Sequence, residues 1–272
     1  MSQDTQRDQI SKRRVVYTIP GMEAVPVRRD EQYRVTAAGP LTMDLYYPLD
    51  SQAGARTPAV IFVTGFSDLG AEKMLGSKFK DMGSFVSWAQ LVAISGLIGI
   101  TYANSEPGDV SDVLHHVQEN AVSLGIDGNR IGIWACSGHG PNALAVLMKH
   151  GRDGLTCAVL AYPYTLDLDG STGTAEAAKQ FRFVTPAAGQ SVNGLPTDLP
   201  LLVARAGRDQ MPGLNDALDR FVGAALAANL PLTLMNHATG PHAFDLFDDT
   251  RTSRDIVKRV LAFLQFHLSA AA

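Results

Sequence analysis

The stretch IGIWACSGHGPNAL, residues 131–144, decides the fold of this chain. It opens with a short apolar run, typical of a buried strand, and then turns abruptly through small residues around one serine, Ser137. An alanine-rich segment of helical character, residues 142–148, follows at once. The pattern predicts a strand, a tight turn and a helix. Such a turn would expose the Ser137 hydroxyl above the sheet edge and direct the first N–H groups of the helix toward an anion.

Strand and helix patterns alternate on both sides of this stretch. Residues 14–19, 32–36 and 41–47 are predicted as short strands that form an antiparallel edge, and residues 58–64 as a strand buried on both faces. The later predicted strands are residues 97–102, 131–135, 157–162, 199–205 and 231–236. Helices are expected at residues 110–124 and 253–268, the second capped by Thr252 or Ser253. The alternation predicts an α/β protein with a mostly parallel central sheet and helices on both faces.

The length of the chain, 272 residues, suits one large domain. We expect an N-terminal arm over residues 1–30 and a single domain over residues 31–272. Two excursions interrupt the alternation, at residues 66–84 and at residues 167–198, and the second holds a short helical patch near residues 175–181. Loops of this length in a compact domain are usually functional or disordered.

Composition excludes several classes of partner. The net charge is −4 and there is no long basic run, so nucleic acid is not an expected partner. The first residues are polar, and no later stretch approaches the length of a membrane helix, so we expect a soluble cytoplasmic protein without a membrane partner. Cys136 and Cys157 are interpreted as free thiols.

The stretch around Ser137 resembles the nucleophile elbow of the α/β-hydrolase fold. The Gly-x-Ser-x-Gly pattern of that elbow needs small residues two positions before and two positions after the nucleophile. Ala135 supplies the first, whereas His139 stands at the second position, with Gly140 just beyond it. The departure at His139 leaves the shape of the turn as a question for the structure.

A second register of the elbow makes Cys136 the nucleophile, as in dienelactone hydrolases. This register would place Trp134 at the crowded position two residues before the nucleophile, so Ser137 is the better candidate. The remaining alternative is an ordinary turn between a strand and a helix.

A nucleophilic serine needs a histidine as base and a carboxylate that orients the histidine. The resemblance implies the order serine, acid, histidine, with each residue on a loop after a strand. Asp209 follows the predicted strand 199–205 and takes the acid position. His242 follows the strand 231–236, with a small residue and an aromatic after it as in the family's histidine loop. Ser137, Asp209 and His242 are therefore the predicted catalytic triad.

Alternatives to two triad members stay open at this point. His237 lies nearer the strand end and could be the base or a structural hydrogen-bonding residue. Asp209 could instead cap the next helix, in which case Asp167 or Asp169 would serve as the acid. The acidic group that begins at Asp245 is interpreted as a solvated region before a helix.

The resemblance also implies an oxyanion hole of two backbone N–H donors. One is Gly138, directly after the nucleophile, and the other is Phe66, with Ser67 as second choice. Thr64 replaces the histidine that the family usually carries before this loop, which leaves the backbone donors available.

The sequence thus predicts a serine hydrolase that cleaves carboxylic esters of small molecules through an acyl-enzyme. It resembles most the dienelactone-hydrolase and esterase-like branch of the superfamily. The resemblance also implies the α/β-hydrolase fold with a small lid insertion, at about residues 167–198. The alternatives are a lactone or dienelactone hydrolase, a peptidase related to prolyl oligopeptidase, and a catalytically silent α/β-hydrolase that acts as a ligand-binding or interaction module. Neither a metal nor a cofactor is expected, because the metal and phosphate-binding motifs are missing. The predicted pocket walls are Trp88, Cys136, Tyr162, Tyr164 and Met211. The N-terminal arm or an exposed apolar strand edge could support a homodimer.

Overall fold

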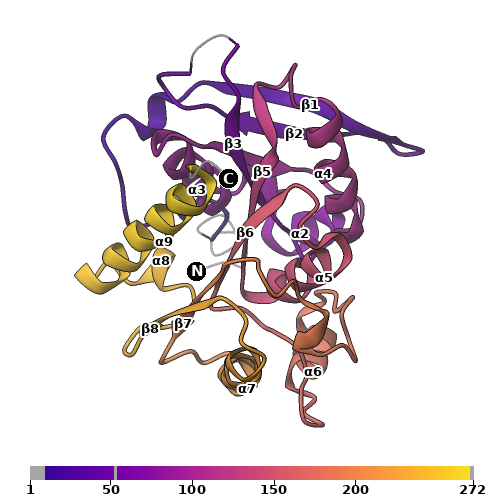
Figure 1. Cartoon of the computed structure of the whole chain (residues 1–272), viewed down its shortest axis with the longest axis vertical. Coiled ribbons are helices and arrows are strands. Elements are labelled where there is room, and N and C mark those ends of the chain that lie inside the picture. Colours follow the sequence, from indigo (N-terminus) through magenta and orange to yellow (C-terminus); the bar gives the residue numbers. More distant parts are fainter. Residues whose placement is uncertain (1–9, 52–53, 270–272) are drawn as a thin grey trace.

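A computed structural model of the chain describes residues 10–51 and 54–269. One eight-stranded sheet runs through this part of the chain (Figure 1). Its strands are β1 (Val27–Thr36), β2 (Gly39–Tyr46), β3 (Thr57–Phe62), β4 (Ile98–Tyr102), β5 (Ile126–Cys136), β6 (Leu155–Ala161), β7 (Leu201–Ala206) and β8 (Leu232–His237). The order across the sheet is β1-β2-β4-β3-β5-β6-β7-β8, so β5, which leads to Ser137, lies in the sheet interior.

Strand directions divide the sheet into two parts. β1 pairs with β2, and β2 with β4, in antiparallel fashion. Every pairing from β4 through β8 is parallel. The predicted antiparallel edge and parallel body are both confirmed. Parallel strands place their carboxyl ends along one edge, where open α/β sheets bind ligands.

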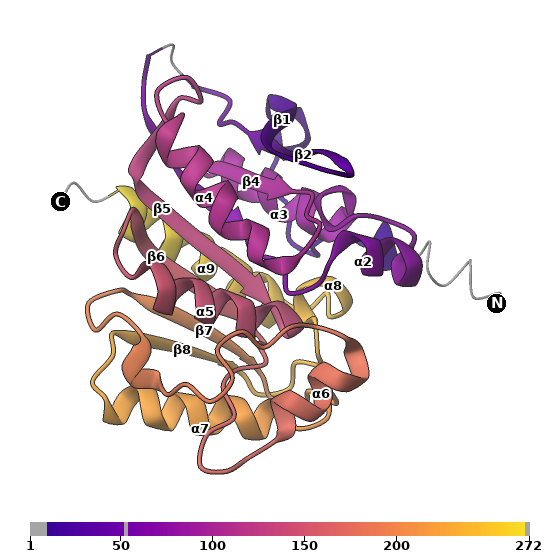
Figure 2. The ribbon, with the colours of Figure 1, turned by 90° about the vertical axis from the view of Figure 1, so that its right-hand side faces the viewer.

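Helices cover both faces of the sheet, as Figure 2 shows. The helices are α2 (Asp68–Leu75), α3 (Gly83–Ile94), α4 (Val110–Glu119), α5 (Gly140–His150), α6 (Gly173–Phe181), α7 (Leu214–Ala227), α8 (Phe244–Phe247) and α9 (Arg251–Ser269). Successive side chains of β5 point to opposite faces of the sheet, and each face has its own buried cluster. Ile131 and Ile133 join the buried cluster of α4, α5 and α7, whereas Trp134 joins the cluster of α3 and α9.

The expected strand at residues 14–19 is absent. This segment instead runs as irregular chain against α3 and α8: Val15 N–H donates to Ser87 Oγ over 3.0 Å, and Val16 N–H donates to the Asp245 carbonyl over 2.8 Å. Val15 is buried there. Its apolar side chain therefore serves docking rather than strand pairing, a distinction that a short apolar run cannot make.

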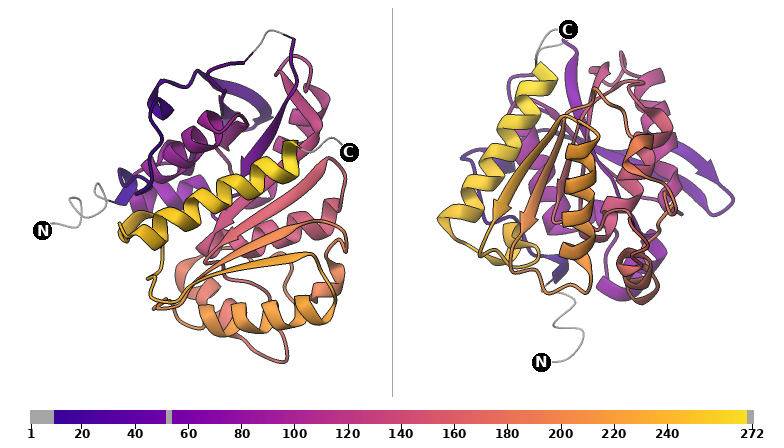
Figure 3. Two further views of the ribbon diagram at one scale, coloured as in Figure 1. Left: turned by 60° about the vertical axis from the view of Figure 1, so that its left-hand side comes forward. Right: turned by 60° about the horizontal axis from the view of Figure 1, so that its bottom comes forward.

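Helix α9 crosses one face of the sheet (Figure 3) and begins earlier than expected. Its first residue is Arg251, and Ser253 N–H donates to Thr250 Oγ1 over 3.3 Å. Thr250 is therefore the N-cap, and the expectation of Thr252 or Ser253 is wrong. Ser253 is instead fully buried. No helix within the described ranges is both long and apolar enough to cross a membrane.

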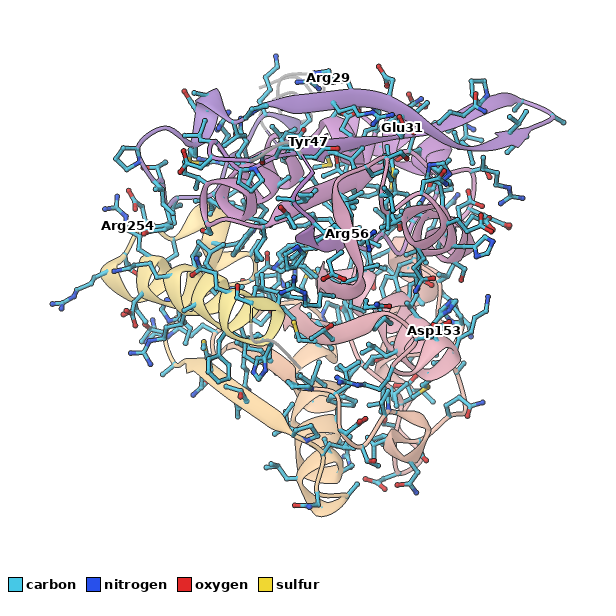
Figure 4. All side chains as sticks on the ribbon, turned by 45° about the horizontal axis from the view of Figure 1, so that its top comes forward. Arg29, Glu31, Tyr47, Arg56, Asp153 and Arg254 are labelled. Atoms are coloured by element: carbon cyan, nitrogen blue, oxygen red, sulfur yellow. The ribbon has the colours of Figure 1, made fainter. Side chains whose placement is uncertain are left out.

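The two edges of the sheet differ in character. Charged side chains of β1, among them Arg29 and Glu31, project at one edge (Figure 4), and such charges discourage pairing with another strand. At the other edge, β8 leaves Leu234 44% exposed. The homodimer stays a prediction.

Candidate active site

Ser137 lies at the junction of β5 and a short 3-10 turn that leads into α5. Its φ is 49°, a left-handed conformation that is uncommon for a residue with a side chain. Such strain, of the order of 1–3 kcal/mol, persists where the surrounding structure imposes it. A Cβ on Gly140 would lie 2.3 Å from the Tyr164 carbonyl oxygen, so this position must be glycine. The sharp turn therefore forms with His139 in place, and the glycine it needs is Gly140.

The loops after β7 and β8 bring an acid and a base to Ser137. Ser137 Oγ lies 2.9 Å from His242 Nε2, and His242 Nδ1 lies 2.7 Å from Asp209 Oδ2. The Asp209 side chain is fully buried, and the His242 side chain is 21% exposed. Because Asp209 can only accept, we assign the proton of the neutral imidazole to Nδ1, which leaves the Nε2 lone pair for the serine hydroxyl.

Backbone hydrogen bonds fix the acid loop and the histidine loop to each other. Gly207 N–H donates to the His237 carbonyl and Arg208 N–H to the Gly240 carbonyl, each over 2.9 Å. The second oxygen of Asp209 accepts the N–H of Met211 over 2.9 Å. The carboxylate is thus oriented by its own loop as well as by His242.

The other candidates for acid and base have different partners. Asp167 accepts the N–H groups of Thr174 and Ala175, each over 2.8 Å, and so caps α6. His237 is buried and contacts Asp248 and Ser253 rather than Ser137. The geometry therefore favours Asp209 and His242.

Cys136 is half-buried, next to Ser137 at the end of β5. Desolvation raises the pKa of its thiol well above the ordinary value. A nucleophilic cysteine needs the opposite, a lowered pKa and a base within reach. The imidazole of His242 hydrogen-bonds Ser137 instead, so the geometry favours the serine register.

The loop between β3 and α2 lies directly against the elbow. A Cβ on Gly65 would lie 2.3 Å from the Gly138 carbonyl oxygen, so only glycine permits this approach. Rings of Phe66 and Phe183 lie on the other side of Gly138, where a Cβ would meet them at 2.9 Å and 2.8 Å. Phe183 belongs to the segment of residues 167–198, so this excursion does reach the elbow. Its role as a lid stays a prediction.

The five predicted pocket walls fall into two groups. Cys136 and Met211 are partly buried, whereas Trp88, Tyr162 and Tyr164 are at most 2% exposed. Tyr164 OH donates to the Pro212 carbonyl over 2.9 Å, and the Tyr162 ring lies edge-on to His242 with centroids 5.0 Å apart. The three buried rings thus support the catalytic loops, and their contact with a substrate stays a prediction.

Asp245 is a buried group whose place the sequence did not reveal. Its carboxylate accepts hydrogen bonds from Trp88 Nε1 over 2.7 Å and from Tyr162 OH over 2.6 Å. Desolvation raises the pKa of this carboxyl. The interpretation of Asp245 as part of a solvated acidic region is therefore wrong. The only clue in the sequence was that Asp245 lies three residues after His242. In the structure this position belongs to α8, and its side chain is buried.

Comparison with known proteins shows the fold. No family model matches the sequence, and a search of curated proteins finds no match. Among solved structures, a thermostable esterase from Pseudomonas putida aligns with a TM-score of 0.72 and 16% identity, over 100% of this chain and 92% of that one. A thermophilic esterase from Thermogutta terrifontis aligns with a TM-score of 0.65 and 19% identity, over 91% and 94% of the two chains.

An α/β-hydrolase enzyme from the metagenome of Lake Arreo, Spain, aligns with a TM-score of 0.66 and 18% identity, over 98% of this chain and 88% of that one. At such low identity the likeness concerns architecture. The strand order, the parallel body of the sheet and these alignments agree: this chain has the α/β-hydrolase fold.

Proposed function

We propose that the protein is a serine hydrolase that cleaves carboxylic esters of small molecules, with Ser137, His242 and Asp209 as its catalytic triad. One observation carries the proposal, the continuous hydrogen-bonded chain from Ser137 Oγ through the imidazole of His242 to the buried Asp209 carboxylate. That chain joins three loops at the carboxyl edge of the sheet. Names of structural neighbours that are esterases are consistent with it.

The reaction follows from the positions of the proton acceptors. His242 Nε2 takes the proton of Ser137 Oγ as this oxygen attacks the ester carbonyl carbon, and Asp209 stabilises the imidazolium that forms. The imidazolium then gives the proton to the departing alkoxide, which leaves an acyl group on Ser137. A water molecule repeats the sequence: His242 removes its proton, the hydroxide attacks the acyl carbon, and Ser137 recovers the proton as the carboxylic acid departs.

The carbonyl oxygen gains negative charge in both steps, and two N–H groups are proposed to stabilise it. Phe66 N–H has no hydrogen-bond partner among residues 10–51 and 54–269. Gly138 lies in the first turn of the 3-10 helix Ser137–His139, where N–H groups have no partner within the helix. Both belong to segments in direct contact with each other beside Ser137. A free donor next to the nucleophile is what an oxyanion hole requires.

Hydrolysis of short-chain p-nitrophenyl esters tests the proposal, together with the intact mass after reaction with a fluorophosphonate. Wild type and Cys136→Ala should turn over the ester and gain one mass adduct, and Ser137→Ala should do neither. Loss of turnover in Cys136→Ala alone would move the nucleophile to the thiol, as in dienelactone hydrolases. A wild type that neither turns over esters nor labels would favour a silent binding module.

A further inference from the structure

His139 joins the two halves of the proposed oxyanion hole. Its Nδ1 accepts the N–H of Gly65 over 2.8 Å. Gly65 directly precedes Phe66, and His139 directly follows Gly138, so this single hydrogen bond links the neighbours of the two proposed donors. The contact is close as well as bonded, because a Cβ on Gly65 would lie 2.9 Å from His139 Cα.

The His139 ring is enclosed by aromatic side chains and is 5% exposed. It lies edge-on to three phenylalanine rings, with centroid distances of 5.1 Å to Phe66, 4.8 Å to Phe79 and 5.6 Å to Phe85. This enclosure lowers the pKa of His139 to about 3, because burial disfavours the charged imidazole. The ring is therefore neutral at physiological pH, with the proton on Nε2 and a lone pair on Nδ1.

The β3–α2 loop contains Gly65, and the backbone groups on both sides of Gly65 N–H also form hydrogen bonds. Thr64 N–H donates to Tyr102 OH over 3.1 Å, and the Thr64 carbonyl accepts from Asn142 over 2.7 Å. The Gly65 carbonyl accepts from Val184 N–H over 2.9 Å.

The next carbonyl along the loop is engaged as well. The Phe66 carbonyl accepts from Asn104 Nδ2 over 3.0 Å. Within the described part of the chain, two N–H groups of this loop are left over, that of Phe66 and that of Ser67, the N-cap of α2. Because the peptide unit is planar, fixing the Gly65 carbonyl fixes the direction of Phe66 N–H, and fixing Gly65 N–H fixes the peptide before it.

We propose that His139 is a positioning residue of the oxyanion hole, whose unprotonated Nδ1 holds the β3–α2 loop so that Phe66 N–H and Gly138 N–H converge on one oxygen. The inference rests on the proposed esterase function and deepens it. It also accounts for a bulky residue at a motif position where small residues are usual: the imidazole supplies a fixed acceptor from the elbow itself.

Three variants separate the effect of the hydrogen-bond acceptor from that of the ring. His139→Phe keeps an aromatic ring and removes the acceptor. His139→Asn places a carbonyl oxygen at the position of Nδ1, and the isosteric His139→Leu lacks it. Removing one oxyanion donor costs about 10²–10³ in kcat, so a misdirected donor should lower kcat by about 10–100-fold in the Phe and Leu variants, whereas Asn should stay within about threefold of wild type.

Kinetic and thermal measurements distinguish a positioning role of His139 from a role in the stability of the fold. KM should change by less than about twofold, whereas the inhibition constant of phenylboronic acid, whose adduct places an oxygen in the hole, should rise in parallel with the loss of kcat. The melting temperature should instead depend on how much of the space of the imidazole ring the new side chain fills. Asn and Leu are similar in size and should therefore lower the melting temperature by similar amounts. If the Phe variant does not fold, the Asn and Leu pair still decides.

Two outcomes would overturn the inference: a Phe variant with the kcat of wild type, or an Asn variant as impaired as Leu. A wild type that neither labels at Ser137 nor hydrolyses esters is a different result. It overturns the proposed function, and the inference with it.

Discussion

Two clusters of serine, histidine and aspartate lie at the end of β8, and only one of them has the geometry of the proposed catalytic triad. In the first, His242 uses both ring nitrogens, one toward Ser137 and one toward Asp209. In the second, Asp248 and Ser253 both approach the same nitrogen, His237 Nε2, at 3.1 Å and 3.0 Å. The two histidines are close in sequence, and each has a serine and an aspartate as hydrogen-bond partners.

The second cluster differs in tautomer and in access. Ser253 Oγ donates to Asp248 over 2.7 Å, so it has no proton for His237, and the imidazole must carry its own on Nε2. His237 Nδ1 is buried and has no hydrogen-bond partner among the residues that the structure describes. The cluster ties the end of β8 to the start of α9. Residue types alone therefore do not define a catalytic triad; the use of both imidazole nitrogens and a serine that is not fully buried distinguish the proposed one.

The sharpest test of this difference compares the two serines. Ser137→Ala should lower kcat/KM for p-nitrophenyl butyrate by about 10⁴-fold or more, because the nucleophile is lost. Ser253→Ala should stay within about threefold, because its hydroxyl serves only the buried cluster. Both are measured by initial rates on folded protein, checked by circular dichroism. An inactive but folded Ser253→Ala would break the comparison.

The acids give the next largest effect. Asp209→Asn should reduce kcat by about 10³–10⁴-fold, since an amide no longer holds His242 in the required tautomer. Asp248→Asn removes the matched carboxylate beside His237 and should leave kcat within about threefold while lowering the melting temperature. Steady-state rates and thermal melts of both variants decide. Equal losses of kcat would show that the second cluster also orients the catalytic loop.

A third histidine, His139, has no carboxylate partner within residues 10–51 and 54–269, and its titration gives a pH test. Its pKa of about 3 lies below that of an unfolded chain, about 6.5. Below about pH 6.5 the unfolded chain therefore binds a proton that the folded protein does not. The free energy of unfolding contributed by this residue is complete above that pH and falls by up to about 1.4 kcal/mol per pH unit toward pH 3.

His139→Asn has no such titrating group, so its unfolding free energy should depend less steeply on pH. Urea unfolding of wild type and variant at pH 7 and pH 5 measures the two slopes, and all other titrating groups are common to both. Parallel slopes would mean that folding does not lower the pKa of His139.

The smallest expected effect concerns the cap beside the second cluster. Thr250→Ala removes the acceptor of Ser253 N–H and should cost about 1 kcal/mol of stability, or about 2–4 °C in melting temperature, with kcat unchanged. Thr252→Ala is the control, because Thr252 is the second residue of α9 and does not cap the helix. A larger fall for Thr252 would restore it as the cap.

Sequence reasoning was most successful where one physical rule decides. The parallel strands follow from continuous apolar runs. The resemblance to the α/β-hydrolases pointed to Ser137, Asp209 and His242, which the structure joins by hydrogen bonds, and their catalytic role stays a prediction. Sequence reasoning failed where long-range contacts decide. The run at residues 14–19 docks on α3 instead of forming a strand, and Asp245 is buried by Trp88, more than a hundred residues away along the chain. His139 looked like a defect of the motif because its partner, Gly65, lies on another loop.

The hydrogen bond from Val16 to the Asp245 carbonyl joins segments from opposite ends of the chain. During synthesis on the ribosome, Ser137 and Asp209 leave the exit tunnel long before His242 does. The early segment must therefore wait for α8 before it has its partner, and such distant contacts form late in folding. The proposed hydrolysis by a nascent chain should therefore appear only once His242 and α8 have emerged from the ribosome.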